Sequence, residues 1–171
     1  TVVCQKTEEY PEKRDLGENK LNISADFLNE SIKATTYVCS KDELKPALNG
    51  VFFDIKKNSI TAVATDAHRL VRYITKQKNK KTEQVLIPSK FLHILSTGAI
   101  NTKKAKLEIF GNYVLVKDER KKITSRLITE KFPDYESVIP DENPNTTKLL
   151  TKDFLSVIRR VSLMSNKTTK Q

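Results

Sequence analysis

Apolar and polar positions along the chain repeat one short pattern three times: an aliphatic residue, three variable positions, then Phe-Leu. The copies span Ile23 to Leu28, Ile87 to Leu92 and Leu150 to Leu155, and their phenylalanines stand 64 and 63 residues apart. That spacing is the length of a supersecondary unit, so the pattern predicts one structural unit used repeatedly.

The first copy lies in a predicted strand-helix-strand-strand-strand unit. Residues 20–23 read as a strand, and a helix is expected from about Ala25 to Tyr37, with Ser24 as its N-cap because a hydroxyl can accept from a first-turn N–H. Runs of β-branched and aromatic residues then predict three strands, at 50–55, 60–64 and 70–74, with turn residues at 57–59.

The second copy predicts the same five elements in the same order. A strand at 84–87 precedes a short helix at 89–95, and Pro88 at the helix start suits a position where no backbone donor is needed. Three further strands are predicted, at 105–110, 113–116 and 122–128, the first two joined by the hairpin loop Gly111-Asn112.

The third copy contains only a helix, expected from an N-cap at Thr151 to about Met164. Its apolar residues recur at i, i+3, i+4 and i+7 and are expected to face a core: Phe154, Val157, Ile158 and Val161. No strand pattern follows, and the chain does not begin with methionine. We therefore expect an internal fragment with one complete two-repeat domain.

Composition adds a class of partner. The 171 residues are 37% hydrophobic and carry a net charge of +10, which favours a nucleic acid or an anionic membrane surface, although the lysines could also merely solvate a basic protein. The sequence has no apolar run of roughly 20 residues and no signal-peptide pattern. We expect a cytoplasmic protein with reduced Cys4 and Cys39.

Four motifs, in order and spacing, resemble the bacterial DNA polymerase III beta subunit family, the sliding clamps. They are Leu48–Phe53, Thr65–Leu70, Ile87–Lys90, and Phe132–Tyr135 together with Val138–Pro140. The resemblance implies an α+β sliding-clamp fold: a pseudo-twofold repeat of β-α-β-β-β units with antiparallel sheets outside and two helices on the pore side.

The resemblance also implies a domain organisation. It assigns residues 1–12 to the end of the first clamp domain, 13–140 to the middle domain, 141–147 to a linker and 148–171 to the first helix of a truncated third domain. The middle domain would hold repeats at about 20–75 and 84–128.

What such a protein does is likewise implied by the resemblance. It would be a processivity factor that encircles double-stranded DNA as a homodimeric ring, without catalysis or cofactor. Its partners would be the DNA polymerase III alpha subunit, the clamp loader and other proteins with a clamp-binding motif. A chain that lacks the first domain and most of the third should not close a ring alone.

The family's partner-peptide cleft, between the middle and third domains, maps onto eight positions here: Leu48, Thr65, Ala67, His68, Arg69, Leu70, Pro133 and Val138. Leu48, Leu70, Pro133 and Val138 would form an apolar floor, and His68 and Arg69 would orient the peptide. Two positions depart from the family. Ala67 replaces the usual glycine, and its side chain is expected to narrow slightly the space through which a peptide approaches the backbone. Ser137 replaces a common arginine, which puts partner preference in doubt.

Basic residues that the resemblance places toward DNA are Lys33, Lys41, Lys45, Lys90, Arg159 and Arg160. Lys90 keeps the matching Pro-x-Lys context, whereas for Lys33, Lys41 and Lys45 a solvated surface is an equal alternative. The run Lys76–Lys81 contains no apolar residue and is favoured as a solvated linker over a DNA contact.

An enzymatic function is a weaker interpretation of these residues. Asp66-x-His68 could begin a metal site and Asp134-Tyr135 could supply an acid and a base, but the chain has only two histidines, too few for a typical catalytic zinc site. We therefore expect no catalytic or metal site. The alternative function is a free-standing basic nucleic-acid-binding module.

Overall fold

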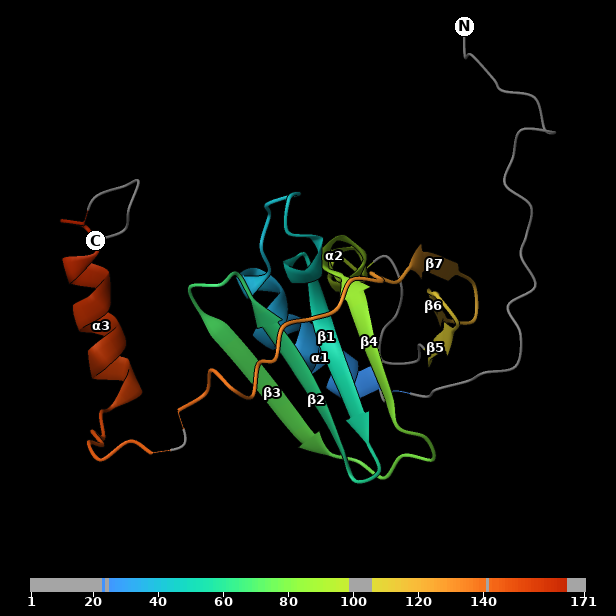
Figure 1. Cartoon of the computed structure of the whole chain (residues 1–171). Helices are drawn as coiled ribbons and strands as arrows, with labels where there is room; N and C mark the ends of the chain where they lie inside the picture. The colour runs from blue at the N-terminus through green and yellow to red at the C-terminus, as the bar shows by residue number, and fades with distance from the viewer. Residues whose placement is uncertain (1–22, 24, 99–105, 141, 166–171) are drawn as a thin grey trace, which may run out of the picture. The chain divides into compact units, whose positions relative to one another are not determined.

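The structure is a computed structural model that describes residues 23, 25–98, 106–140 and 142–165 (Figure 1). It divides into two compact units, Thr1–Pro133 and Asp134–Gln171, which are described separately. The predicted N-cap Ser24, the predicted strand before Ile23 and Cys4 all lie outside the described residues. The predicted domain boundaries stay a prediction.

The first unit has two α-helices, α1 (Ala25–Thr35) and α2 (Ser89–Ser96). α1 ends two residues earlier than predicted, because the chain tightens into the 3-10 helix η2 (Thr36–Val38). The Thr35 and Thr36 hydroxyls donate to the carbonyls four residues earlier, at 2.5 and 2.7 Å, a bond that competes with regular helix geometry. A second 3-10 helix, η3 (Pro46–Leu48), follows.

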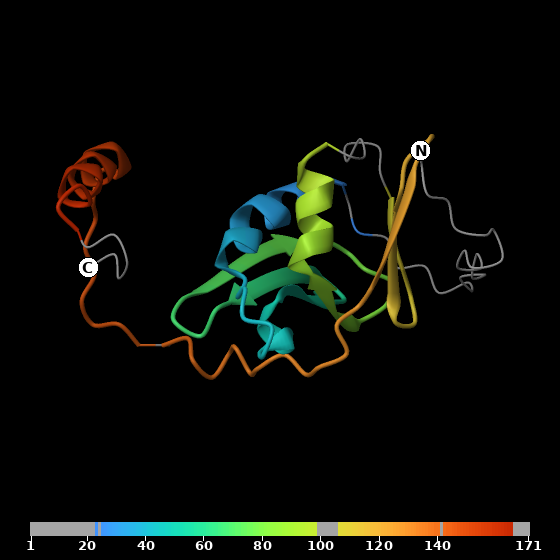
Figure 2. The same cartoon turned by 90° about the horizontal axis from the view of Figure 1, so that it is seen from above.

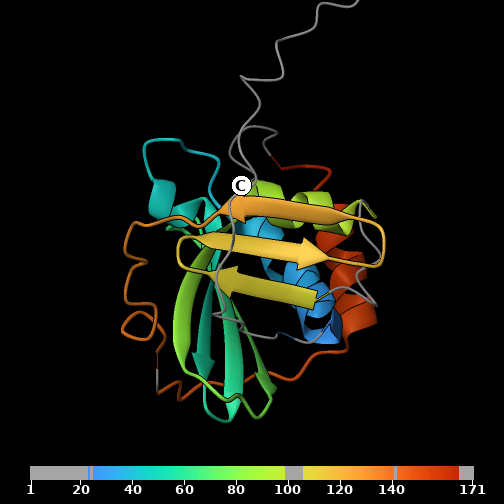
Figure 3. The same ribbon diagram turned by 90° about the vertical axis from the view of Figure 1, so that its right-hand side faces the viewer.

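Two antiparallel sheets account for the predicted strands. The four-stranded sheet has the order β3-β2-β1-β4, and its members are β1 (Gly50–Lys56), β2 (Ser59–Thr65), β3 (Leu70–Lys76) and β4 (Glu83–Pro88). The three-stranded sheet β5-β6-β7, seen face-on in Figure 3, comprises β5 (Lys106–Phe110), β6 (Tyr113–Lys117) and β7 (Lys122–Arg126). The predicted strands within the described residues are confirmed, with ends shifted by one or two residues.

The two repeats pair with each other through their backbones. β4 opens the second repeat but pairs with β1 of the first, while Ile23, from the first repeat, pairs with Leu107 of β5 in the second. On its other side β4 accepts a backbone hydrogen bond at the Leu86 carbonyl from Ile128, at 2.9 Å. The sheets are therefore connected through β4, and the repeats form one folding unit.

Both helices cover the same face of the four-stranded sheet, as Figure 2 shows. The Phe27 ring of α1 meets Phe53 of β1 edge-on at 6.3 Å and stacks against Tyr73 of β3 at 5.6 Å. The core draws buried side chains from both repeats, among them Leu28, Ile32, Val51, Ile60, Ile87, Leu92, Leu95, Leu107 and Ile109. This arrangement confirms the α+β prediction.

The other face of the sheet holds the chain that leaves β7. Phe52 alternates with the core residue Phe53 and so points away from the helices, where the Phe132 ring stacks on it at 4.9 Å with an interplanar angle of 3°. Both Figure 1 and Figure 2 place this segment opposite the helices. The stack fixes where the chain reaches Pro133.

The second unit contains the helix α3 (Thr151–Val161). The predicted N-cap is wrong by one residue, because Leu150 takes that position and Thr151 is the first helical residue. The expected burial of the apolar stripe is also wrong for this chain: Phe154, Val157, Ile158 and Val161 are all exposed. The described part of this unit contains no strand that could cover them.

A membrane-spanning element was not expected, and in the part of the chain that the structure describes no helix combines the length and apolar character needed to cross a bilayer.

Gly50 tests the pairing of β1 with β4. A Cβ at this position would lie 2.6 Å from the Ile87 carbonyl oxygen and 2.8 Å from Ile128 Cδ1. We expect Gly50→Ala to lower the free energy of unfolding by about 1–3 kcal/mol, because a backbone atom must move. Chemical denaturation of the purified chain measures the loss.

A second substitution shows whether crowding is the cause. Ile128→Val removes Cδ1 and should cost about 0.5–1.5 kcal/mol in the native background. In the Gly50→Ala background it should cost less, because it also relieves the crowding. Strictly additive losses would contradict the crowding explanation.

Candidate functional site

One end of the four-stranded sheet gathers most of the predicted site residues. Because the strands are antiparallel, β1 and β3 begin where β2 and β4 end, as the pairs Gly50↔Pro88 and Thr65↔Leu70 show. We call this the site end, made of residues 36–50, 65–70 and 88–90. Nine predicted positions belong to it: Lys41, Lys45, Leu48, Thr65, Ala67, His68, Arg69, Leu70 and, in α2, Lys90.

The turn between β2 and β3 is held by the carboxylate of Asp66. Asp66 Oδ1 accepts from the backbone N–H groups of His68 and Arg69, both at 3.0 Å, and Oδ2 accepts from Arg69 Nε at 3.1 Å. Thr65 Oγ1 adds a donated bond to the Arg69 carbonyl at 2.8 Å and accepts from Ala67 N at 3.1 Å. The backbone of the turn is therefore fixed before any ligand arrives.

The charge of Asp66 follows from the same contacts. Slight burial raises its pKa, but the two backbone N–H groups and the Arg69 guanidinium outweigh that effect and hold the pKa of Asp66 below its usual value. The carboxylate is thus ionised at neutral pH. Both carboxylate oxygens accept hydrogen bonds within the turn, which argues against the hypothesis that Asp66-x-His68 begins a metal site.

Ala67 adopts the left-handed backbone region, with a φ of 77°. A Cβ in this region approaches the following carbonyl, which costs about 1–2 kcal/mol for a residue other than glycine. Alanine in place of the family's usual glycine therefore strains the backbone of the turn at position 67. Its predicted effect on the approach of a peptide stays a prediction.

Arg69 links the turn to η2. Its Nη2 donates to the Tyr37 carbonyl at 3.3 Å, and its guanidinium carbon lies 6.0 Å from the centre of the Tyr37 ring. Arg69 is exposed, yet the Asp66 carboxylate, the Tyr37 carbonyl and the Tyr37 ring restrict its side chain. Sequence reasoning missed Tyr37, and it considered Asp66 only as a possible metal ligand, although Asp66 lies inside the motif Thr65–Leu70 and could have been recognised as a turn-capping residue.

The proposed apolar floor is only partly assembled by the described residues. Leu48 is buried and its carbonyl accepts from Ser40 N at 2.9 Å, so it lies against the same segment that carries Tyr37. Leu70 is half-buried, while Pro133 is exposed directly after the stacked Phe132. Val138 is exposed in the second unit. The joint cleft of these residues stays a prediction.

A pocket of about 940 Å³ opens at the site end, between the segment after α1 and the start of α2. Two predicted DNA-facing residues, Lys41 and Lys90, line it together with Tyr37 and His93. Both lysines are exposed. Sequence reasoning placed Lys41 and Lys90 in separate elements, and the fold brings them to one pocket.

The lining of this pocket includes the side chain of Asn49. Asn49 Nδ2 donates to the Asp42 carbonyl at 3.0 Å, and Ser89 N donates to the Asn49 carbonyl at 3.0 Å. Asn49 Oδ1 is buried without a hydrogen-bond partner among the described residues. Cys39, also in the lining, donates to the Gly50 carbonyl, and burial raises the pKa of its thiol to about 11. The thiol is therefore protonated at neutral pH.

The remaining predicted DNA-facing residues lie elsewhere. Lys33 is exposed on α1 and forms a surface pair with Glu30 at 3.5 Å. Arg159 and Arg160 are exposed in the last turn of α3, in the second unit. Across the described ranges, no three His, Cys, Asp or Glu side chains are grouped so that they could hold a metal ion.

Residues 22–134 match the family described as DNA polymerase III beta subunit, central domain. The chain belongs to this family. It is 31% identical to the beta sliding clamp of Haemophilus influenzae, with 97% of the chain and 46% of that protein covered. The chain thus spans about half the length of the curated relatives that it matches.

Solved clamps have the same fold. The DNA polymerase sliding clamp of Bacillus subtilis matches 96% of the chain and 44% of its own length, with a TM-score of 0.81 and 29% identity. The Helicobacter pylori beta clamp, solved with a DNA ligase peptide bound, matches 94% of the chain and 46% of its own length, with a TM-score of 0.83 and 19% identity. The sliding-clamp fold predicted from the sequence is confirmed.

In this member of the clamp family, replacing Ala67 by glycine should stabilise the turn. Relief of the left-handed strain is worth about 1–2 kcal/mol, and the extra freedom of glycine in the unfolded chain offsets about 0.4–1 kcal/mol. We expect Ala67→Gly to raise the free energy of unfolding by roughly 0.5–1 kcal/mol, measured by denaturant titration. The control Ala34→Gly, inside α1, should lower it by a similar amount. A loss of stability in both variants would refute the explanation that Ala67 is strained in the left-handed region.

Proposed function

We propose that the protein to which this chain belongs is a DNA sliding clamp, the processivity factor of the replicative polymerase. The observation that carries this proposal is the family match over residues 22–134, on a fold in which two interlocked repeats place both helices on one face. In this proposal the protein is a non-catalytic bacterial cytoplasmic subunit that closes a ring as a homodimer. Residues 13–140 form its middle domain and 148–171 begin its third.

DNA contact in this proposal is made through charge. The net charge of +10, with Lys41 and Lys90 together at one pocket, supports a role in attracting phosphates. Lys33, Lys45, Arg159 and Arg160 are exposed cations that add to it. Attraction to phosphates hardly varies from one base pair to the next, so a ring held this way can slide.

Partner binding in this proposal takes place at the site end. The turn Thr65–Leu70 presents a backbone fixed by Asp66, and Arg69 is held by Tyr37, so little ordering is required when a peptide binds. Leu48 and Leu70 supply apolar surface, and Pro133 and Val138 complete the cleft. The occupants are peptide motifs of the polymerase alpha subunit, the clamp loader and related proteins, as in the Helicobacter pylori clamp with its ligase peptide.

The ring is tested with the full-length protein loaded on DNA by its clamp loader. We expect retention on closed circular duplex and loss through the free ends of linear duplex, because a ring is held by topology. The 171-residue chain alone should bind both forms feebly and equally. Equal, tight binding of both forms by the chain alone would instead favour a free-standing nucleic-acid-binding module.

Arg69→Ala in the full-length protein tests the peptide site. Loss of charge-assisted hydrogen bonds of about 1.5–3 kcal/mol should weaken binding of a fluorescent alpha-subunit peptide by about tenfold or more. Arg72→Ala, an exposed arginine two residues into β3, is the matched control and should leave the affinity unchanged. Equal effects of the two substitutions on peptide affinity, measured by fluorescence anisotropy, would show that Arg69 has no specific role in binding the peptide.

A further inference from the structure

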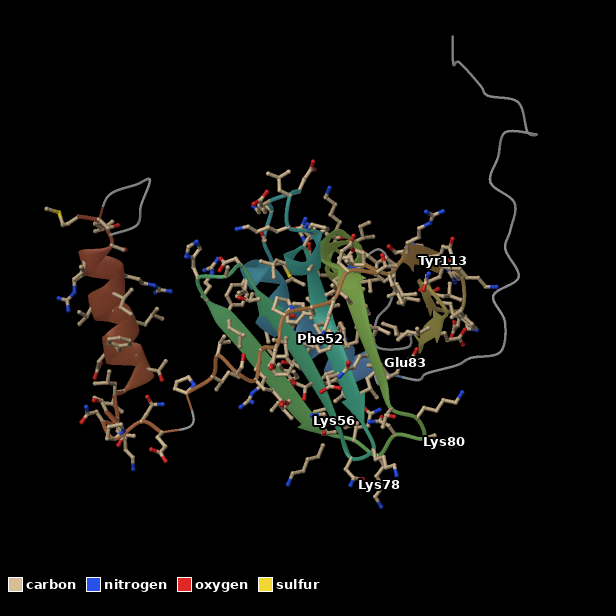
Figure 4. All side chains as sticks on the ribbon, in the orientation of Figure 1. Phe52, Lys56, Lys78, Lys80, Glu83 and Tyr113 are labelled. Carbon is tan, nitrogen blue, oxygen red and sulfur yellow. The ribbon has the colours of Figure 1, made fainter. Side chains whose placement is uncertain are left out.

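The opposite end of the four-stranded sheet carries six lysines. They lie at the last residues of β1 and β3 and in the loops that follow these strands: Lys56, Lys57, Lys76, Lys78, Lys80 and Lys81. We call these residues, with the loops 56–59 and 76–83, the lysine end. All six are exposed, and Figure 4 labels three of them, Lys56, Lys78 and Lys80. The site end lies about 20 Å away, six strand steps of about 3.3 Å along β1.

The two loops are fastened to each other, which a solvated linker would not require. Asn79 Nδ2 donates to the Lys56 carbonyl at 2.7 Å and to the Ser59 carbonyl at 3.3 Å, while Asn79 N donates to the Lys57 carbonyl at 2.8 Å. Gln77 N donates to the Asn58 carbonyl at 3.1 Å. Lysines that are some 20 residues apart in sequence are therefore held on one surface.

Acidic side chains neutralise only part of this charge. Among residues 54–59 and 76–83 the six lysines face two carboxylates, Asp54 and Glu83, which leaves a net charge of +4. Asp54 is buried and pairs with Lys56 Nζ at 3.2 Å, and it also accepts from Gln84 Nε2 at 3.2 Å. The excess is thus concentrated on the exposed loops.

The composition of the loops selects the kind of partner. Residues 56–59 and 76–82 contain no aliphatic or aromatic side chain, so the surface offers no anchor of the kind on which protein interfaces depend. It also offers no ring on which an unpaired base could stack. Every cation is a lysine, a point charge that binds phosphate without demanding one orientation. The surface therefore fits a duplex, whose phosphates are accessible while its bases are stacked inside.

We propose that the lysine end is a second, sequence-independent contact surface for the phosphate backbone of duplex nucleic acid. It goes beyond the sliding-clamp function, because it needs neither a closed ring nor the peptide site. Since the two ends terminate the same strands in opposite directions, a peptide at the site end does not cover it.

The test uses the 171-residue chain and a fluorescent 20-base-pair duplex in two unrelated sequences. Affinity is followed by anisotropy as salt rises from 25 to 200 mM. The variant Lys57→Gln/Lys78→Gln/Lys80→Gln should bind both sequences at least about tenfold more weakly at low salt. Its slope of log affinity against log salt should be shallower by up to about 2.7, or 0.9 for each phosphate that the variant no longer neutralises.

Matched variants separate the contribution of the lysine end to duplex affinity from that of overall net charge and from that of the DNA-facing residues proposed for the clamp. Lys122→Gln/Lys131→Gln/Lys148→Gln removes the same charge from exposed positions elsewhere and should change the slope far less. Lys41→Gln/Lys45→Gln/Lys90→Gln tests the site end independently, so either surface can fail without the other. Asn79→Ala, which alters no charge, should weaken binding about threefold because it frees the loops, with circular dichroism confirming the fold.

Three results would overturn the proposal. They are no binding by the unaltered chain at 25 mM salt, equal losses in the lysine-end and the 122/131/148 variants, and tighter binding to polyglutamate or to phosphatidylglycerol vesicles than to the duplex. The last result would assign the surface to an acidic protein or to a membrane.

Discussion

Backbone pairing between the two repeats is the constraint on which the first unit depends. β4 opens the second repeat but completes the sheet of the first, and Ile23 pairs reciprocally with Leu107. Each repeat therefore supplies backbone partners to the other, a whole strand in the case of β4 and a single bridge in the case of Ile23. One apolar core serves both repeats, and the close approach at Gly50 is a local consequence of that pairing.

The antiparallel order that results gives the sheet two chemically different ends. At the site end, Asp66 accepts three hydrogen bonds and fixes a turn beside Leu48 and Leu70. At the lysine end, the two N–H groups of the Asn79 side chain are shared among three backbone carbonyls and fix a loop that has only polar side chains. Short polar side chains thus order both ends by bonding to nearby backbone, and the residues around each end differ: apolar at the site end and basic at the lysine end.

The sequence was informative where the signal was local. The β-branched runs of β1 and β2 and the spacing of apolar residues in α2 predicted those elements to within one or two residues. The pairing between the repeats was not predicted, since nothing near Ile23 in the sequence points to Leu107. Asp66 was read as a possible metal ligand because its donors belong to a turn geometry that spacing alone does not reveal. The stripe on α3 was expected to be buried because periodicity shows that a face is apolar, not what covers it.

The stack of Phe132 on Phe52 decides the side from which the chain departs. Because Phe52 points away from α1 and α2, the stretch up to Pro133 is laid along the outer wall of the sheet. Within the described residues of the first unit, the connection that follows β7 therefore lies on the face of the sheet opposite α1 and α2. The surface that the two helices form and the surface that carries this connection are thus the two opposite faces of one sheet.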